Sequence, residues 1–168
     1  ILYKNVVISP IFLYLNPCFQ INLRSHKLFN ITPCALTHTL EHCTSFAYYD
    51  TLVPPQNVKP DEGIFLEYAP LEKYVAQGED AEERIACEKE MIPHLVKTFA
   101  NEPKKVLEYW YDNSMFSRWK KPPQKFILNE ENMIADIKEY KSFGFDSFST
   151  FACFLGKDYE ELHGDVDV

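Results

Sequence analysis

From residue 44 onward, segments typical of β-strands alternate with segments typical of α-helices, and this alternation constrains the fold more than any other feature. Runs of β-forming residues occur at 44–49, 63–70, 105–108 and 145–151. Helical patterns occupy residues 80–100 and 130–142. The order strand, strand, helix, strand, helix, strand is typical of βα units, whose strands pair in parallel. We therefore predict an α/β fold with a parallel sheet.

The two predicted helices carry boundary residues of the expected kinds. Asp80 and Asn129 precede them, and both residue types accept hydrogen bonds from the first turn of a helix. Gly144 follows the second helix, where a left-handed backbone favours glycine. Pro93 falls inside the first helical pattern, so we expect a kinked helix or two separate pieces there.

Acidic and aromatic residues stand side by side near the ends of three predicted strands. The pairs are Tyr49-Asp50, Glu67-Tyr68 and Glu108-Tyr109. Parallel strands bring their carboxyl ends to one edge of a sheet, so we predict that the three pairs line the same rim. Carboxylates bind sugar hydroxyls or transfer protons, and flat rings pack against sugar faces. The pattern therefore favours a carbohydrate site, and the structural alternative is that the aromatics fill a core.

Glycoside hydrolysis normally needs two carboxylates. Glu108 is our first candidate for a carboxylate that faces the sugar, and Asp50 and Glu67 are the others. Each has a structural alternative, because Asp50 would also cap a loop and Glu67 would also pair with a lysine. Predicted substrate-binding residues complete the site: Tyr49, Tyr109, Trp110, Asp112 and Trp119.

The sequence pattern places further conditions on several of these assignments. Side chains alternate along a strand, so Glu108 and Trp110 are expected on one face and Tyr109 on the other. Asp112 would hold a sugar hydroxyl or, alternatively, cap a helix. Trp119 lies in the segment 113–125, which prolines stiffen and which has the form of a substrate-covering loop.

Charge and composition exclude several classes of partner. The formal net charge is -8, which argues against binding to nucleic acid or to an anionic membrane. The sequence has no apolar run of about 18 residues that would predict a transmembrane helix. The five glycines form no phosphate-binding loop, so no cofactor is implied. The five scattered cysteines are typical of reduced thiols and slightly favour a cytoplasmic over a secreted protein.

Residues 1–43 are poorly readable and differ in charge from residues 44–168, which we assign to the folded domain. Their single acid, Glu41, belongs to the sequence His38-Thr39-Leu40-Glu41-His42. This matches the H-x-x-E-H pattern of some zinc peptidases, in which two histidines one helical turn apart hold the metal. No third ligand stands out. We therefore favour an ordinary helix surface, predict no metal site, and keep a zinc peptidase as a remote alternative.

Three long stretches resemble a known family. They are FAYYDTLVPPQNVKPDEGIFLEYAPLEKY (46–74), KKVLEYWYDNSMFSRWKKPPQKF (104–126) and DIKEYKSFGFDSFSTFACFLGKDYEEL (136–162). In this order they are similar to the bacterial domain-of-unknown-function 4838 family. The resemblance extends from Phe46 to Leu162 and does not include residues 1–43.

The resemblance implies a (β/α)8 TIM-type barrel related to glycoside hydrolases that act on hexosamine- or uronate-containing glycans. A complete barrel needs roughly 250 residues, so 168 residues predict about its second half, with the other half expected from sequence outside this chain. Two functions remain open: hydrolysis of glycosidic bonds by the full-length parent, and a non-catalytic carbohydrate-binding or structural remnant of such a barrel.

Overall fold

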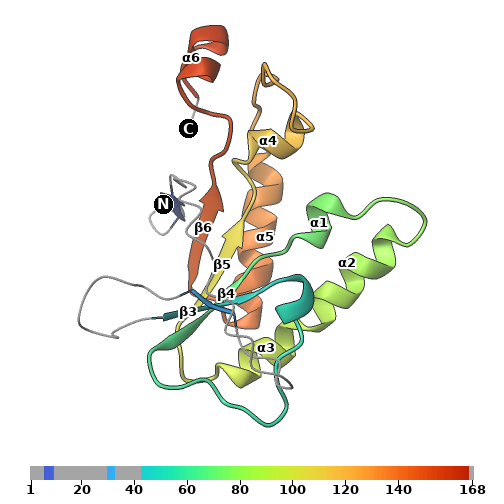
Figure 1. The fold of residues 1–168 in the computed structure, drawn as a ribbon, viewed down its shortest axis with the longest axis vertical. Helices are drawn as coiled ribbons and strands as arrows, with labels where there is room; N and C mark the ends of the chain where they lie inside the picture. Colours follow the sequence, from blue (N-terminus) through green and yellow to red (C-terminus); the bar gives the residue numbers. More distant parts are fainter. Residues whose placement is uncertain (1–5, 10–29, 33–42, 167–168) are drawn as a thin grey trace.

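A six-stranded, largely parallel sheet forms the centre of the computed structural model, which describes residues 6–9, 30–32 and 43–166 (Figure 1). The strands are β1 (Val6–Ser9), β2 (Asn30–Thr32), β3 (Cys43–Ala47), β4 (Ile64–Tyr68), β5 (Lys104–Glu108) and β6 (Ser147–Phe151). Their order across the sheet is β1-β6-β5-β4-β3-β2. Among the described strands, only the pair of β2 with β3 is antiparallel. The predicted α/β fold with a parallel sheet is confirmed.

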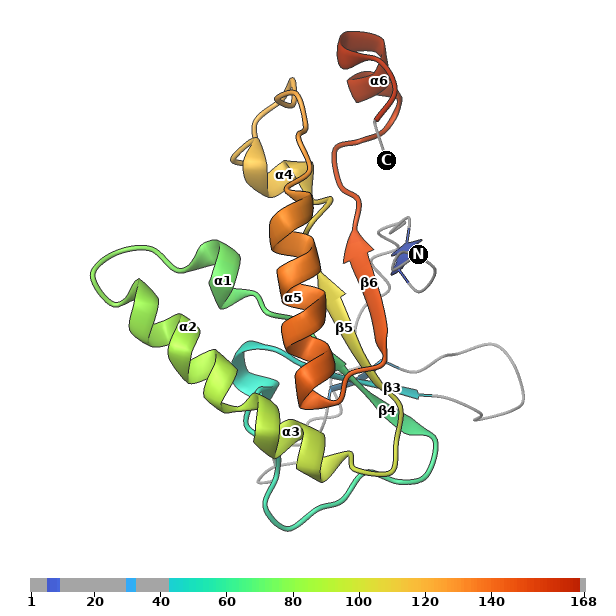
Figure 2. The same ribbon diagram turned by 180° about the vertical axis from the view of Figure 1, so that it is seen from behind.

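Helices cover one side of this sheet. The helical elements are η2 (Tyr49–Thr51, a 3-10 helix), α1 (Glu72–Val75), α2 (Ala81–Glu90), α3 (Ile92–Thr98), α4 (Asn113–Phe116), α5 (Glu130–Phe143) and α6 (Lys157–His163). Helix α5 lies in front of the sheet when the molecule is seen from behind, and α2 and α3 run beside it (Figure 2). The connection from β3 to β4 contains η2 but no α-helix.

The boundary signals of the helices are mostly confirmed. The first helical pattern forms two helices, and Pro93 is the second residue of α3, where a missing N–H costs no hydrogen bond. The Asn129 side chain accepts a hydrogen bond from the backbone of Asn132, and Gly144 has a φ of 99°. Asp80 precedes α2 as expected, but its side chain makes no capping hydrogen bond. The prediction that this side chain caps the helix is therefore wrong.

The main core lies between the sheet and its helices. Alternate strand residues point into it, among them Leu66, Tyr68, Val106 and Phe148. Helices α3 and α5, with Phe99 directly after α3, contribute Ile92, Leu95, Phe99, Met133, Ile137 and Tyr140. A second, smaller cluster contains Ala69, Leu107 and Tyr109, with Phe46 and Phe151 packed against it. Leu107 lies between core residues on β5, so this cluster belongs to the other face of the sheet.

The segment 1–43 contributes the two edge strands of the sheet: β1 pairs with β6, and β2 pairs with β3. His38, Glu41 and His42 lie outside the described residues. In the part of the chain that the structure describes, no helix is long and apolar enough to cross a membrane.

Candidate functional site

The carboxyl ends of β3, β4, β5 and β6 meet at one edge of the sheet, where α/β proteins generally bind ligands. The segments that follow these four strands are η2, α1, the stretch from 109 to 129 with α4, and the stretch from 152 to 156. The residues predicted for the site lie at the ends of these strands or in the segments that follow them.

Glu108, the last residue of β5, lies in the centre of a closed set of hydrogen bonds. Glu108 is fully buried, with 0% of its surface exposed. Its Oε1 accepts from Lys73 Nζ (3.2 Å) and from the Tyr140 hydroxyl (2.6 Å). Its Oε2 accepts from the Tyr74 hydroxyl (2.6 Å) and from the backbone N–H of Tyr109 (3.0 Å). A carboxylate has about four acceptor positions, and all are occupied by the protein's own donors.

Asp136 of α5 extends this set of contacts. Its Oδ2 accepts from Trp110 Nε1 at 2.9 Å and forms an ion pair with Lys73 Nζ. Lys73 therefore joins a carboxylate of the strand to one of the helix. We call the following residues the Glu108 cluster: Lys73, Tyr74, Glu108, Trp110, Asp136 and Tyr140. The cluster connects α1, β5 and α5, which are far apart in the sequence.

The tyrosines of the Glu108 cluster act as hydrogen-bond donors. Burial, followed by the adjacent charge of Glu108, raises the pKa of the Tyr74 and Tyr140 hydroxyls far above the ordinary range. Both hydroxyls therefore keep their protons, which they donate to Glu108. The arrangement holds the layers of the fold together and leaves no acceptor position of Glu108 free for a ligand.

The three acid–aromatic pairs lie at the carboxyl edge of the sheet, but their carboxylates do not converge on one site. Leu66 and Tyr68 point into the main core, so Glu67 between them points to the opposite face of the sheet. Glu108 instead contacts Tyr140 of that core. Glu67 also pairs in register with Lys105 and lies 2.8 Å from its Nζ. The alternative given for Glu67, an ion pair with a lysine, is therefore the one that the structure shows.

Asp50 and Tyr49 lie beyond β3, in η2. Thr51 fixes this turn, because its Oγ1 donates to the carbonyl of Phe46 at 2.9 Å and accepts from the backbone N–H of Tyr48 at 3.2 Å. Tyr49 has a positive φ of 45° and is 51% exposed. Asp50 is exposed as well, whereas Glu108 is enclosed, so the two carboxylates do not form a pair.

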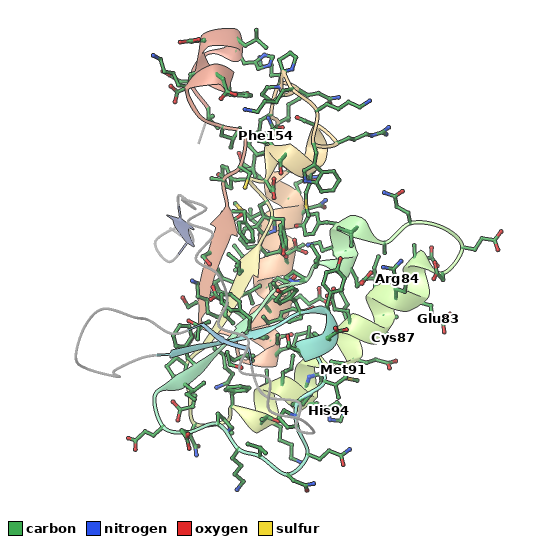
Figure 3. All side chains as sticks on the ribbon, in the orientation of Figure 1. Glu83, Arg84, Cys87, Met91, His94 and Phe154 are labelled. Carbon is green, nitrogen blue, oxygen red and sulfur yellow. The ribbon has the colours of Figure 1, made fainter. Side chains whose placement is uncertain are left out.

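A groove of about 500 Å³ runs between η2 and α2. Tyr49 lines one side, and Arg84, Cys87 and Met91 line the other, where they follow one another along α2 and its end (Figure 3). Glu88 also lines the groove and is buried. The groove thus combines an exposed aromatic ring with charged groups.

Glu88 differs from Glu108 in its partners. Its Oε1 accepts from the backbone N–H of Glu72 at 3.4 Å, and no lysine or arginine of the described residues pairs with it. Arg84 lies instead 2.6 Å from the carboxylate of Glu72. Burial raises the pKa of Glu88 to about 7, opposed by the hydrogen bond from the Glu72 backbone and reinforced by the Glu72 carboxylate. Glu88 therefore exchanges its proton near neutral pH.

Three other predicted binding residues are largely buried. Tyr109 stacks on Phe151 with ring centroids 4.9 Å apart, and Trp110 belongs to the main core. They point to opposite faces, as the alternation predicts. Asp112 caps α4, because its Oδ1 accepts from the backbone N–H groups of Ser114 (2.9 Å) and Met115 (3.3 Å). The helix-capping alternative for Asp112 is thus the one that the structure shows.

Trp119 is open to solvent, like Tyr49 and Asp50, and 64% of its surface is exposed. It belongs to the segment that we call the basic loop, residues 116–125. Arg118 and Trp119 both have left-handed backbones, with φ of 52° and 55°. This conformation is uncommon for residues other than glycine and costs free energy that the surroundings must offset.

Buried polar side chains form hydrogen bonds that hold the basic loop in place. Asn113 is 0% exposed, and its Nδ2 donates to the carbonyl of Gln124 at 2.9 Å. Ser117 is also buried, and its Oγ accepts from the backbone N–H of Gln124 at 2.9 Å. The backbone N–H of Trp119 donates to the carbonyl of Ser114 at 2.7 Å. These bonds hold the exposed ring on a defined backbone.

The sequence patterns did not single out the partners of Glu108. Tyr74 and Tyr140 lie 34 and 32 residues from it along the chain, and Lys73 lies 35 residues away. One signal was available: Tyr140 falls on the apolar face of its helix, and a buried tyrosine hydroxyl usually needs a partner. Lys73 and Asp136 gave no such signal, since charged residues on helices are most often at the surface.

No family model matches this chain, and neither a curated protein nor a solved structure matches it. The resemblance to the domain-of-unknown-function 4838 family therefore stays a hypothesis. Within the described residues, no group of three or more histidine, cysteine, aspartate or glutamate side chains is placed to hold a metal ion.

Proposed function

We propose that this chain is part of the wall of a glycoside hydrolase-like (β/α)8 barrel and that the carboxyl edge of its sheet binds a glycan. The parallel strands β3 to β6 follow one another in sequence order across the sheet. Helices α2, α3 and α5 lie on one side of them (Figure 2). Sequential parallel strands with helices on one side are the arrangement of a barrel wall.

The observation that carries the proposal is the exposed ring of Trp119 on a rigid support. A tryptophan that served only to stabilise the fold would be mostly buried. The left-handed backbone at Arg118 and Trp119 instead presents the ring to solvent, and Asn113 and Ser117 hold the loop in place. A flat apolar ring with polar neighbours, at the carboxyl edge of a parallel sheet, suits the face of a sugar.

Binding is favoured over hydrolysis for the described residues. The acid at the strand end, Glu108, has all of its acceptor positions filled, and Glu67 is paired with Lys105. Neither is free to donate a proton to a glycosidic oxygen. If the full-length parent cleaves glycans, we propose that its carboxylate pair lies elsewhere than in these two residues.

Hydrolysis is the second candidate, and one observation favours it. Glu88 lines the same groove as the exposed ring of Tyr49, and burial raises its pKa to about 7. A general acid needs a carboxyl group that keeps its proton near neutral pH. In this alternative the sugar would lie in the groove, with Glu88 as the proton donor.

The test of the proposed function is a glycan-binding screen on the intact chain. We expect wild-type protein to bind at least one oligosaccharide, Trp119→Ala to lose about tenfold or more in affinity, and Val58→Ala to bind normally. Val58 is a matched control, since it is an exposed apolar residue outside the basic loop, in the connection between η2 and β4. Binding that depends on Tyr49 and not on Trp119 would move the site to the groove, and hydrolysis lost in Glu88→Gln would support the second candidate.

A further inference from the structure

We propose that the basic loop selects an anionic glycan, one whose sugars carry carboxylate or sulfate groups. This inference rests on the proposed function, because it names the class of glycan that the Trp119 site would take. It is carried by the charges of the loop, by the lack of ion pairs for most of them, and by the rigid backbone that presents them.

The charge of the loop is opposite to that of the chain. Four basic residues and no acid occur between positions 118 and 125, while the whole chain has a formal net charge of -8. They are Arg118, Lys120, Lys121 and Lys125, and all four are exposed. A group of cations in an otherwise acidic protein is a local feature, and it attracts anions that the remaining surface repels.

Most of these cations are not used by the fold. Lys121 Nζ lies 2.8 Å from the Asp158 carboxylate and 5.1 Å from the ring centroid of Phe154, so it attaches the loop to α6 and to the segment after β6. Arg118, Lys120 and Lys125 make no ion pair among the described residues. Three cationic groups thus remain available to a ligand.

These cations are displayed on a fixed backbone. The N–H of Arg118 donates to the carbonyl of Met115 at 2.9 Å, and the N–H of Lys120 donates to the carbonyl of Ser117 at 3.1 Å. His163 of α6 contacts the carbonyl of Pro123 at 2.9 Å. A loop that is already ordered loses less entropy when it binds, so its contacts contribute more to affinity.

Arg118 and Lys120 precede and follow Trp119 in the chain, and this composition fits a charged sugar better than a neutral one. The ring would lie against the face of the sugar, while the guanidinium pairs with a carboxylate or sulfate through two parallel hydrogen bonds. Lys120 and Lys125 would supply further positive charge to the same or the next residue of the glycan. A neutral sugar would use the ring alone.

The experiment compares matched ligands on one protein. Affinities are measured by calorimetry for a neutral oligosaccharide of glucose, for an oligogalacturonate and a heparin-derived oligosaccharide of the same length, and for a single-stranded DNA oligomer. Three proteins are used: wild type, the variant Arg118→Gln/Lys120→Gln/Lys125→Gln, and the control Lys59→Gln/Lys97→Gln/Lys138→Gln. The control removes the same charge from exposed lysines outside the loop.

We expect wild type to bind one of the two anionic glycans about tenfold more tightly than the neutral one, with an advantage that decreases as salt is added. The loop variant should lose this advantage, and the control should keep it. The oligogalacturonate and the heparin-derived ligand distinguish carboxylate from sulfate recognition. Folding of all three proteins is checked by circular dichroism.

Three results would overturn the inference. If neutral and anionic glycans bind equally and depend on Trp119, charge selection fails while glycan binding stands. If no glycan binds at all, the proposed function fails with it. If DNA binds as tightly as the anionic glycan, and the loop variant loses both, the loop is a general polyanion surface and not a glycan site.

Discussion

The Glu108 cluster lies at the end of β5 and the basic loop lies in the segment that follows it, yet they use charged and aromatic residues in opposite ways. In the cluster, Glu108 is 0% exposed and receives two donors at each carboxylate oxygen. In the loop, Arg118 and Lys120 are exposed and unpaired in the described part of the chain, and Trp119 is 64% exposed. In the cluster, one cation, Lys73, is paired with two carboxylates, and in the loop most of the charges are left for solvent or a ligand.

This difference shows that an acid beside an aromatic does not by itself mark a binding site. Glu108 has the composition of a sugar-binding carboxylate, but its partners come from α1 and α5 and enclose it. A closed network stabilises the fold because a buried charge needs its partners. An open group of charges on a rigid loop contributes little to stability and is available for recognition. Four substitutions test this contrast.

Removing the centre of the cluster should have the largest effect on stability. Glu108→Ala leaves Lys73, Tyr74 and Tyr140 without their common acceptor, and we expect a loss of about 3–5 kcal/mol in the free energy of unfolding. Urea denaturation measures it. Asp50→Ala, at an exposed carboxylate on η2, should change stability by less than about 0.5 kcal/mol. Equal effects of the two substitutions would contradict a structural role for Glu108.

The support of the basic loop should give the next largest effect. Asn113→Ala removes a buried donor to the carbonyl of Gln124, so we expect a loss of about 1–3 kcal/mol. The loss should be local, with faster hydrogen exchange between residues 116 and 125 and slow exchange retained in β5. If exchange in the loop did not change, the loop would owe its order to other contacts.

Much of the fold could be predicted from the sequence because its local signals agree. The predicted strands at 63–70 and 145–151 contain β4 and β6, and the one at 105–108 covers all of β5 except its first residue. The cap at Asn129 and the left-handed Gly144 fix the ends of α5. Such signals depend on residues a few positions away in the sequence, so they can be recognised without knowledge of the tertiary contacts.

The site was predicted less well because it depends on direction and on distant contacts. The alternation in β4 turns Glu67 toward the face opposite to the main core, where Lys105 pairs with it. The position of an acid at the end of a strand does not determine which face of the sheet its side chain occupies. Trp119 was identified by its place in a proline-stiffened loop, whereas the support from Asn113 and Ser117 depends on bonds to Gln124 across the loop.

Glu88 is an intermediate case, since it is buried like Glu108 but has no cationic partner in the described part of the chain. Its pKa is raised to about 7, above the ordinary 4.5, so the folded state binds its proton more tightly than the unfolded state. Stability should therefore be highest below pH 4.5 for this group and decrease as the pH rises to about 7. Other carboxyl groups titrate in the same range, so the effect must be measured as a difference between proteins.

Glu88→Gln isolates that difference. We expect the variant to be more stable than wild type at pH 8 by about 1–2 kcal/mol, less than the full shift would give because water still reaches the groove. The advantage should disappear near pH 4.5. Glu83→Gln is the matched control, because Glu83 lines the same groove but is exposed. An advantage that did not depend on pH would rule out titration of Glu88 as its cause.

Trp119→Ala should have the smallest effect on stability and the clearest effect on binding. The ring is 64% exposed, so its loss should change the free energy of unfolding by less than about 0.5 kcal/mol. The left-handed backbone at position 119 is an unfavourable conformation for alanine as well, so the substitution gives no relief of strain. Trp110→Ala, which removes a core ring of the same type, should instead cost about 3–5 kcal/mol. A stability loss at Trp119 close to that at Trp110 would mean that the ring supports the fold, and the contrast between an enclosed cluster and an open loop would then fail.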